Sequence, residues 1–259
     1  MTRFRAFSRL RLRLRNRYAR TAAGLLARRV VMIQSSCPVI SFTFDDFPTS
    51  ALELGGAILN KCGTAGTYYT SLGLLGRTTP VGKIASASDL ERVLSAGHEL
   101  GCHTFAHCHA WETRPQVFEA SVVENRRALN ALLPDATFET MSYPISNPRP
   151  GTKRRVSRYF ACCRGGGQTF NSGLTDLNNV SAFFLEQSRE NPGSIKELID
   201  RNCAARGWLV FATHDVCDSP GPFGCTPEFF EDIVRYCVTS GAKLLPIRKA
   251  LEVLCPSQQ

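Results

Sequence analysis

Short apolar runs alternate with helical patterns along most of the chain. Uninterrupted apolar runs predict buried strands, and apolar residues spaced three and four apart predict the helices between them. The expected strands are 39–44, 66–70, 99–102, 137–141, 160–163, 208–212 and 243–245. The expected helices are 51–62, 88–96, 115–133, 152–159, 194–205, 227–239 and 248–254. This alternation predicts parallel strands joined by helical crossovers, which close into a barrel or open into a wound sheet.

The beginning of the chain differs in kind from the rest. The first 29 residues contain ten arginines and no acidic residue. Helical spacing places apolar residues on one side, namely Phe7, Leu10, Leu14, Tyr18, Ala22 and Leu25. We therefore expect residues 1–30 to form a basic amphipathic extension and residues 31–259 to form the folded domain. The extension is expected either to dock on an anionic membrane surface or to serve as a disordered or domain-covering tail.

Charge and cysteine content narrow the class of protein. The net charge of +9 lies in the extension, since the remainder carries 21 basic against 22 acidic residues, so no nucleic-acid partner is expected. No apolar run approaches the roughly 18 residues that a membrane span requires. Eleven irregularly spaced cysteines favour reduced thiols in a cytosol. The short apolar stretch 21–27 is bounded by arginines and is expected to stay uncleaved, so the predicted location is cytoplasmic, either free or peripheral at the inner membrane.

Three expected strands end in residues suited to metal binding or acid–base chemistry. Asp45 and Asp46 follow the first strand, His103 and His107 the third, and His214 the strand that begins at residue 208. In a parallel barrel these ends converge on one rim. Two imidazoles and one carboxylate leave coordination positions open for water, which is typical of a catalytic zinc site.

Adjacent aspartates at a strand end point in different directions. One carboxylate can then bind a cation while the other faces a water on that cation, although a turn and helix cap before Pro48 is the alternative. His214 is placed to donate a proton, or it is a hydrogen-bonded histidine at the rim.

These motifs resemble those of the polysaccharide deacetylase family, also called carbohydrate esterase family 4. The matching segments are Thr43-Phe44-Asp45-Asp46, Gly97-His98-Glu99-Leu100-Gly101, His103-Thr104-Phe105-Ala106-His107, Tyr143-Pro144 and Thr213-His214-Asp215. They occur in the family's order and cover the chain from about Cys37 to Cys255.

The resemblance implies a distorted (β/α)7 barrel of parallel strands with outer helices. It implies a hydrolase of carbon–nitrogen non-peptide bonds that removes N-acetyl or O-acetyl groups from an acetylated amino sugar, oligosaccharide or polysaccharide. By this resemblance, Asp45 is the general base and His214 the general acid. Asp46, His103 and His107 are the ligands of one divalent metal ion, which we expect to be zinc. The backbone amide of Ile145 donates to the oxyanion, and Asp176 adjusts His214.

The third motif departs from the family's pattern. The family usually has an arginine that orients the base where Ser142 stands and an aromatic residue where Ile145 stands. The last motif departs as well, because the family usually has a leucine where Ala212 stands, two residues before His214. Arg149 or Arg164 is available to replace the arginine. Two alternatives remain: hydrolysis of small cyclic amides or ureides on the same fold, and a sugar- or membrane-binding relative without catalysis. The intact set of acidic residues and histidines argues against the second, because binding alone needs no paired acid and base.

Overall fold

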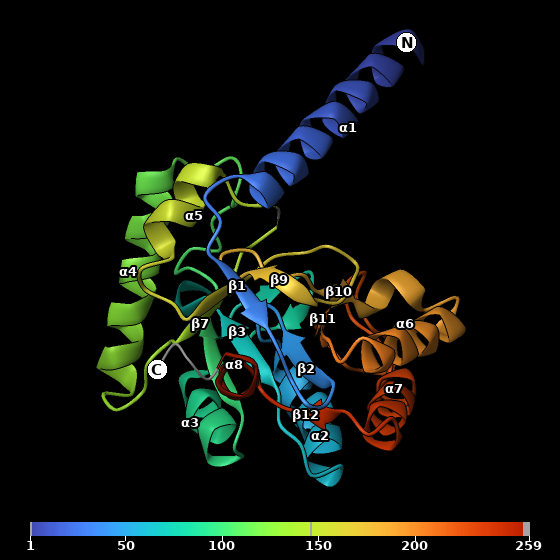
Figure 1. The fold of residues 1–259 in the computed structure, drawn as a ribbon. Coiled ribbons are helices and arrows are strands. Elements are labelled where there is room, and N and C mark those ends of the chain that lie inside the picture. Colours follow the sequence, from blue (N-terminus) through green and yellow to red (C-terminus); the bar gives the residue numbers. More distant parts are fainter. Residues whose placement is uncertain (1, 146, 256–259) are drawn as a thin grey trace.

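A curled parallel sheet forms the centre of the molecule. The computed structural model describes residues 2–145 and 147–255, with side chains described from residue 14 onward (Figure 1). The strand order is β10-β11-β2-β3-β6-β7-β8, and β12 pairs with the beginning of β2. The bounds are β10 (Phe183–Phe184), β11 (Trp208–Thr213), β2 (Val39–Phe44), β3 (Thr67–Thr70), β6 (Glu99–Cys102), β7 (Thr140–Ser142), β8 (Cys162–Arg164) and β12 (Lys243–Leu244). Every pairing is parallel, and no ladder between described residues joins β8 to β10. The expected distorted barrel is confirmed, as an open half-barrel.

The two longest strands lie side by side and are buried on both faces. β2 and β11 pair over six residues, and every residue of both is buried. Phe42 stacks on Phe211 with ring centroids 5.3 Å apart. Apolar runs without alternation are typical of strands covered on both faces, which agrees with the burial of every residue in β2 and β11.

Helices cover the outside of the sheet (Figure 1). Their bounds are α2 (Ala57–Lys61), α3 (Ala87–Ser95), α4 (Pro115–Leu132), α5 (Pro150–Val156), α6 (Pro192–Ala204), α7 (Pro227–Thr239) and α8 (Ile247–Leu254), with shorter turns η1 (Ala51–Gly56), η2 (Leu72–Leu74) and η3 (Leu185–Ser188). Proline begins α4, α5, α6 and α7, where its missing N–H has no helical partner to lose. The helix expected over 51–62 is a π-helical turn, η1, that continues into α2. There the backbone lies close to the sheet, because a Cβ on Gly55 would meet the Phe44 ring at 2.9 Å.

Two antiparallel pairs lie outside the main sheet. β1 (Val30–Ile33) pairs with β9 (Gly173–Asp176), and β4 (Thr78–Thr79) pairs with β5 (Gly82–Lys83). The β1–β9 pair crosses in front of the main sheet in Figure 1 and leads directly from the N-terminal helix.

The N-terminal helix α1 (Thr2–Leu25) begins well away from the body and ends against it (Figure 1). Leu14, Tyr18 and Leu25, expected on an apolar face, are exposed, and the buried contacts come from Ala19, Ala22 and Ala23. Phe7 and Leu10 lie outside the described side chains. Small side chains make the buried contact, and the larger apolar ones stay in solvent. No helix among the described residues is both long and apolar enough to cross a bilayer.

The end of α1 is fixed to the body by a buried cation. Lys153 of α5 is fully buried, and its Nζ donates to the carbonyl oxygens of Ala23 and Leu26 and pairs with Asp176 Oδ2 at 2.7 Å. The Arg29 guanidinium donates to carbonyl oxygens at the end of α5 and the start of β8, those of Ser157, Phe160 and Ala161.

Candidate metal centre and active site

The carboxyl ends of five neighbouring strands bring the candidate residues to one edge. Asp45 and Asp46 follow β2, His103 and His107 follow β6, and His214 follows β11. Ser142 and Arg164 are the last residues of β7 and β8. Parallel strands collect their carboxyl ends at one edge of a barrel, so segments more than 100 residues apart in sequence meet there.

Asp46, His103 and His107 form a compact cluster. Asp46 Oδ1 lies 3.0 Å from His107 Nε2 and 3.6 Å from His103 Nε2, and the three ligand atoms lie within 4.8 Å of one another. Donors about 2.0–2.1 Å from a tetrahedral zinc ion stand roughly 3.3 Å apart. Asp46 Oδ1 is buried and accepts no well-aligned hydrogen bond from any described residue. A buried carboxylate oxygen without a well-aligned hydrogen-bond donor, facing two imidazole nitrogens, fits a divalent cation.

The protonation state of His103 suits a metal ligand. Burial lowers the pKa of His103 to about 4, against the opposing effect of Asp45 and Asp46. Its Nδ1 lies 3.0 Å from the carbonyl oxygen and 2.6 Å from Oγ of Ser142. With Nδ1 donating to the carbonyl oxygen, Nε2 keeps its lone pair and faces Asp46. At the more open position of His107, burial lowers the pKa but the ion pair with Asp46 outweighs it and raises the pKa overall.

Unusual backbone angles gather at this edge. Asp46 (φ 61°), Thr104 (φ 61°), His107 (φ 50°) and Ile145 (φ 70°) all adopt left-handed conformations, as does Phe47 beside Asp46. Each such non-glycine residue costs about 1–3 kcal/mol, and these conformations persist only where the surrounding structure enforces them. Their concentration around the cluster indicates that the fold holds these side chains in place for a function.

Asp45 is held by an arginine that comes from a different strand than the family's pattern suggests. Arg164 Nη2 donates to both carboxylate oxygens of Asp45, and Ser142 Oγ donates to Oδ1 at 2.9 Å. Burial alone raises the pKa of Asp45, but the adjacent Arg164 guanidinium, with His103 nearby, holds it well below its usual range. Arg149 lies elsewhere: its Nε donates to the carbonyl oxygen of Trp111. Arg164 on β8 is therefore the cation that pairs with Asp45 in this structure.

Ile145 and His214 are two further candidate residues. The Ile145 side chain is 64% exposed, and its N–H donates to no described residue. His214 is half-buried, with Nδ1 3.3 Å from the carbonyl oxygen of Phe223. Burial raises the pKa of Asp46, but the His107 ion pair, with His103 and His214 nearby, lowers it overall. His214 is thus within electrostatic reach of the candidate metal centre.

The structure does not bring Asp176 to His214. Its carboxylate accepts hydrogen bonds from the N–H groups of Arg29 at 2.9 Å and Asn178 at 3.0 Å and pairs with Lys153. No contact between described residues joins it to His214, so Asp176 serves the anchoring of α1. Glu186 of η3 is a further acidic residue within electrostatic reach of His214: burial raises the pKa of Glu186, and a backbone hydrogen bond and His214 act in the opposite direction. No motif in the sequence identifies Glu186.

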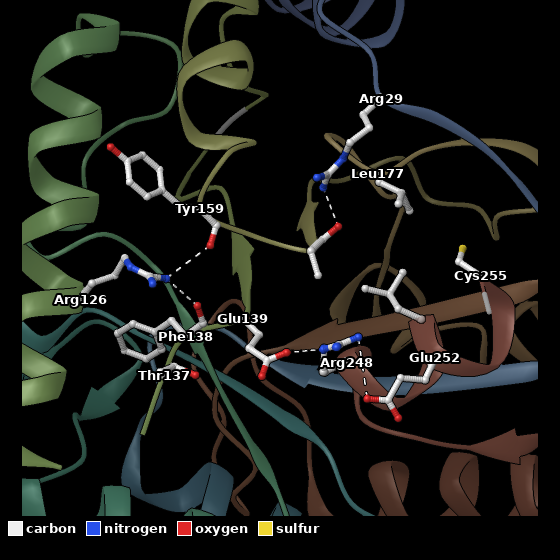
Figure 2. Close-up of a pocket in the computed structure, with 12 residues that line it drawn as sticks. Arg29, Arg126, Thr137, Phe138, Glu139, Tyr159, Leu177, Arg248, Glu252 and Cys255 are labelled. Atoms are coloured by element: carbon white, nitrogen blue, oxygen red, sulfur yellow. Dashed lines mark hydrogen bonds and ion pairs between the residues drawn. The ribbon is translucent and has the colours of Figure 1, made fainter. Parts of the chain in front are cut away.

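A large cavity lies at the opposite edge of the sheet. It has a volume of about 820 Å³ and is lined by residues that precede β7 and β8 and by parts of α4 and α8 (Figure 2). Its three arginines are engaged: Arg29 and Arg126 donate to backbone carbonyl oxygens, and Arg248 pairs with Glu139 and Glu252. None of the candidate active-site residues lines this cavity.

Together, the half-barrel and the cluster at its carboxyl edge define an α/β-barrel protein with a candidate metal centre. Residues 33–159 match the model of the family described as polysaccharide deacetylase, which confirms the resemblance seen in the sequence motifs. The similarity in fold covers more of the chain than the match to the family model, because solved structures align with 82% and 85% of it.

The chain is similar in fold to several solved structures of carbohydrate esterase family 4. A cobalt-bound acetyl xylan esterase from Clostridium thermocellum shares 17% identity at a TM-score of 0.55, covering 82% of this chain and 90% of that one. The peptidoglycan deacetylase PdaC from Bacillus subtilis shares 14% identity at a TM-score of 0.56, covering 85% and 93%. A family pseudoenzyme from Bacillus anthracis shares 12% identity at a TM-score of 0.59, covering 84% and 66%. No curated protein matches the chain in sequence.

Proposed function

We propose that this protein is a metal-dependent hydrolase that removes acetyl groups from acetylated amino sugars, in free, oligomeric or polymeric form. The observation that carries the proposal is the cluster of Asp46, His103 and His107, in which a buried carboxylate oxygen without a well-aligned hydrogen-bond donor faces two imidazole nitrogens. The match to the family model supports the deacetylase chemistry. Two nitrogen ligands and one oxygen ligand favour zinc.

The chain's own residues divide the work of amide hydrolysis. Asp46, His103 and His107 would hold a divalent cation, and this cation would supply Lewis acidity to the attacking water and to the acetamide carbonyl. Asp45 accepts a proton from the attacking water, whose oxygen bonds to the carbonyl carbon. The N–H of Ile145 donates to the carbonyl oxygen as negative charge develops there. His214 protonates the nitrogen as the carbon–nitrogen bond breaks, leaving acetate and a free amine.

Arg164 and Ser142 set the state of the base in this scheme. Both donate to Asp45, so its carboxylate stays ionised and fixed in orientation at neutral pH. Asp45 is thereby held in the state and orientation needed to accept a proton from the attacking water. Asp45 and the neighbouring Asp46 cluster therefore act on the same water in this proposal, which explains why the two aspartates stand side by side.

Acetate release with and without the cluster tests the proposal. The zinc-loaded wild type is expected to release acetate from chitooligosaccharides, and Asp46→Ala is expected to lose zinc and activity together. Asp135→Ala, which removes an exposed carboxylate, is the matched control and keeps both. A wild type that binds zinc yet releases no acetate from any acetylated sugar would place the chain with the pseudoenzymes. Ring opening of cyclic ureides, assayed in parallel, would instead favour the amidohydrolase alternative.

We further propose that residues 1–30 are a basic extension through which the protein contacts an anionic membrane, at the cytoplasmic face of the inner membrane. The ten arginines of this segment stand without an acidic residue, and Leu14, Tyr18 and Leu25 are exposed beside them. Arginine and exposed apolar groups on one helix support interfacial binding to anionic lipids. The remainder, residues 31–259, is proposed as the catalytic domain.

A further inference from the structure

A second cavity lies between α1 and two loops of the candidate active site. It has a volume of about 330 Å³. Arg15 and Arg20 contribute from α1, and Trp111, Ile145 and Asn147 face them from the loops. Because α1 forms one wall, the basic extension is part of the surroundings of the active site as well as an appendage to the fold.

Specific contacts hold α1 over these loops. Arg15 pairs with Glu112 at 3.0 Å, and Tyr18 meets the Trp111 ring edge-on with centroids 5.9 Å apart. On the loop side, Arg149 lies over the Trp111 ring at 5.9 Å and donates to the Trp111 carbonyl oxygen. Ala19, one helical turn after Arg15 in α1, is buried. The wall is therefore built by an ion pair, an aromatic contact and close helix packing.

Residues of the proposed reaction centre, or close to it in sequence, also line the cavity. Ile145, whose N–H we assign to the carbonyl oxygen of the substrate, is one of its lining residues, and so is His109, two residues after His107. A group bound in this cavity is thus close to the acetamide being hydrolysed.

The chemistry of the lining selects an anion. Arg15 is engaged by Glu112, whereas Arg20 forms no ion pair with any residue in 14–145 or 147–255. Residues 1–29 contain no acidic group to neutralise it. Arginine binds phosphate and carboxylate oxygens through several N–H groups, and the amide of Asn147 offers further donors. Trp111 adds an apolar side chain to the lining.

We propose that this cavity is a subsite that binds an anionic group, phosphate or carboxylate, carried by the saccharide beside the acetylated position. This inference rests on the proposed function and names the substrate class: an acidic acetylated saccharide. Arg20 is the specificity-determining residue, and α1 is required for the subsite to exist.

Direct binding tests the subsite without relying on turnover. Calorimetric titration of the zinc-loaded protein compares N-acetylglucosamine 1-phosphate with N-acetylglucosamine, and N-acetylmuramic acid supplies the carboxylate arm. We expect at least one acidic sugar to bind about tenfold more tightly than the neutral one. Whichever of the two acidic sugars binds more tightly identifies the anion for which the subsite is built.

Two arginine variants locate the effect. Arg20→Gln is expected to abolish the preference for the acidic sugar, and Arg17→Gln, which removes an exposed arginine outside the cavity lining, is expected to keep it. Both positions are exposed, so neither change removes a buried contact. Equal affinity of the wild type for acidic and neutral sugars overturns the proposal, as does an equal loss of preference in both variants. A retained preference without acetate release from any substrate would overturn the proposed hydrolysis and leave the subsite standing.

Discussion

Replacing Arg164 by methionine removes the cation that compensates Asp45. Arg164 is 1% exposed and Asp45 5% exposed, so the remaining carboxylate stays buried with only Ser142 Oγ as a donor. Removing one partner of a buried ion pair costs about 3–5 kcal/mol, because the other charge is left without compensation. We expect Arg164→Met to lower the free energy of unfolding by about this amount at pH 7, as measured by urea denaturation.

The loss of stability in Arg164→Met is expected to be larger at neutral pH than at acidic pH. In the wild type the pKa of folded Asp45 lies below its unfolded value of about 3.9, so its contribution to stability is present above that value and is lost only as pH falls through the folded pKa. In Arg164→Met, burial dominates and raises the pKa of folded Asp45 above the unfolded value. The variant is then destabilised increasingly as pH rises above about 4, so the difference from wild type is expected to shrink by about 1 kcal/mol or more between pH 7 and pH 4.5.

A double variant supplies the control. Asp45→Asn combined with Arg164→Met removes the buried charge, and we expect it to be more stable at pH 7 than Arg164→Met alone and to lack the additional pH dependence. If Arg164→Met loses the same free energy at both pH values, or if the double variant is no more stable, the pairing is not what keeps Asp45 ionised and the reasoning fails.

Three further changes probe other parts of the account. His214→Asn is expected to slow acetate release by about 10²–10⁴-fold with zinc content unchanged, and a rate within a few fold of wild type would remove His214 from the mechanism. Lys153→Met leaves Asp176 buried without its cation and is expected to lower the free energy of unfolding, measured by urea denaturation, by about 3–5 kcal/mol. Lys196→Met breaks a half-exposed pair and is expected to lower it by no more than about 1 kcal/mol. Equal losses of stability in the two variants would contradict the anchoring role of Lys153. Deleting residues 1–13 removes five arginines and is expected to weaken sedimentation with phosphatidylserine vesicles, and unchanged partition would refute the membrane contact.

Elements with strong local patterns are predictable from the sequence. The bounds of β2, β6 and α7 agree with expectation, because each is an apolar or amphipathic segment with a clear end, such as Pro227 at the start of α7. β1 and β9 escaped prediction. Val30–Ile33 is half exposed and follows a run of arginines, and its partner lies more than 140 residues further along the chain. Pairing between weak, distant segments leaves no local signal.

The residues of the candidate metal centre were predictable from their positions in the sequence. The arginine that pairs with Asp45 was not. Asp46, His103 and His107 stand directly after buried strands, and parallel strands bring such positions together. The choice of Arg164 over Arg149 as the partner of Asp45 depends on how β8 lies beside β7, which the sequence pattern does not specify. Asp176 resembled a family position in sequence, but its place on β9 directs it to Lys153.

The most direct test is anomalous diffraction from crystals grown with zinc, recorded at the zinc absorption edge. We predict a peak about 2.0–2.2 Å from Asp46 Oδ1 and from the Nε2 atoms of His103 and His107. A zinc ion bound only to other residues, or an Asp46 carboxylate turned away from both imidazoles in the zinc-soaked crystal, would contradict the proposed metal centre and the hydrolysis that depends on it.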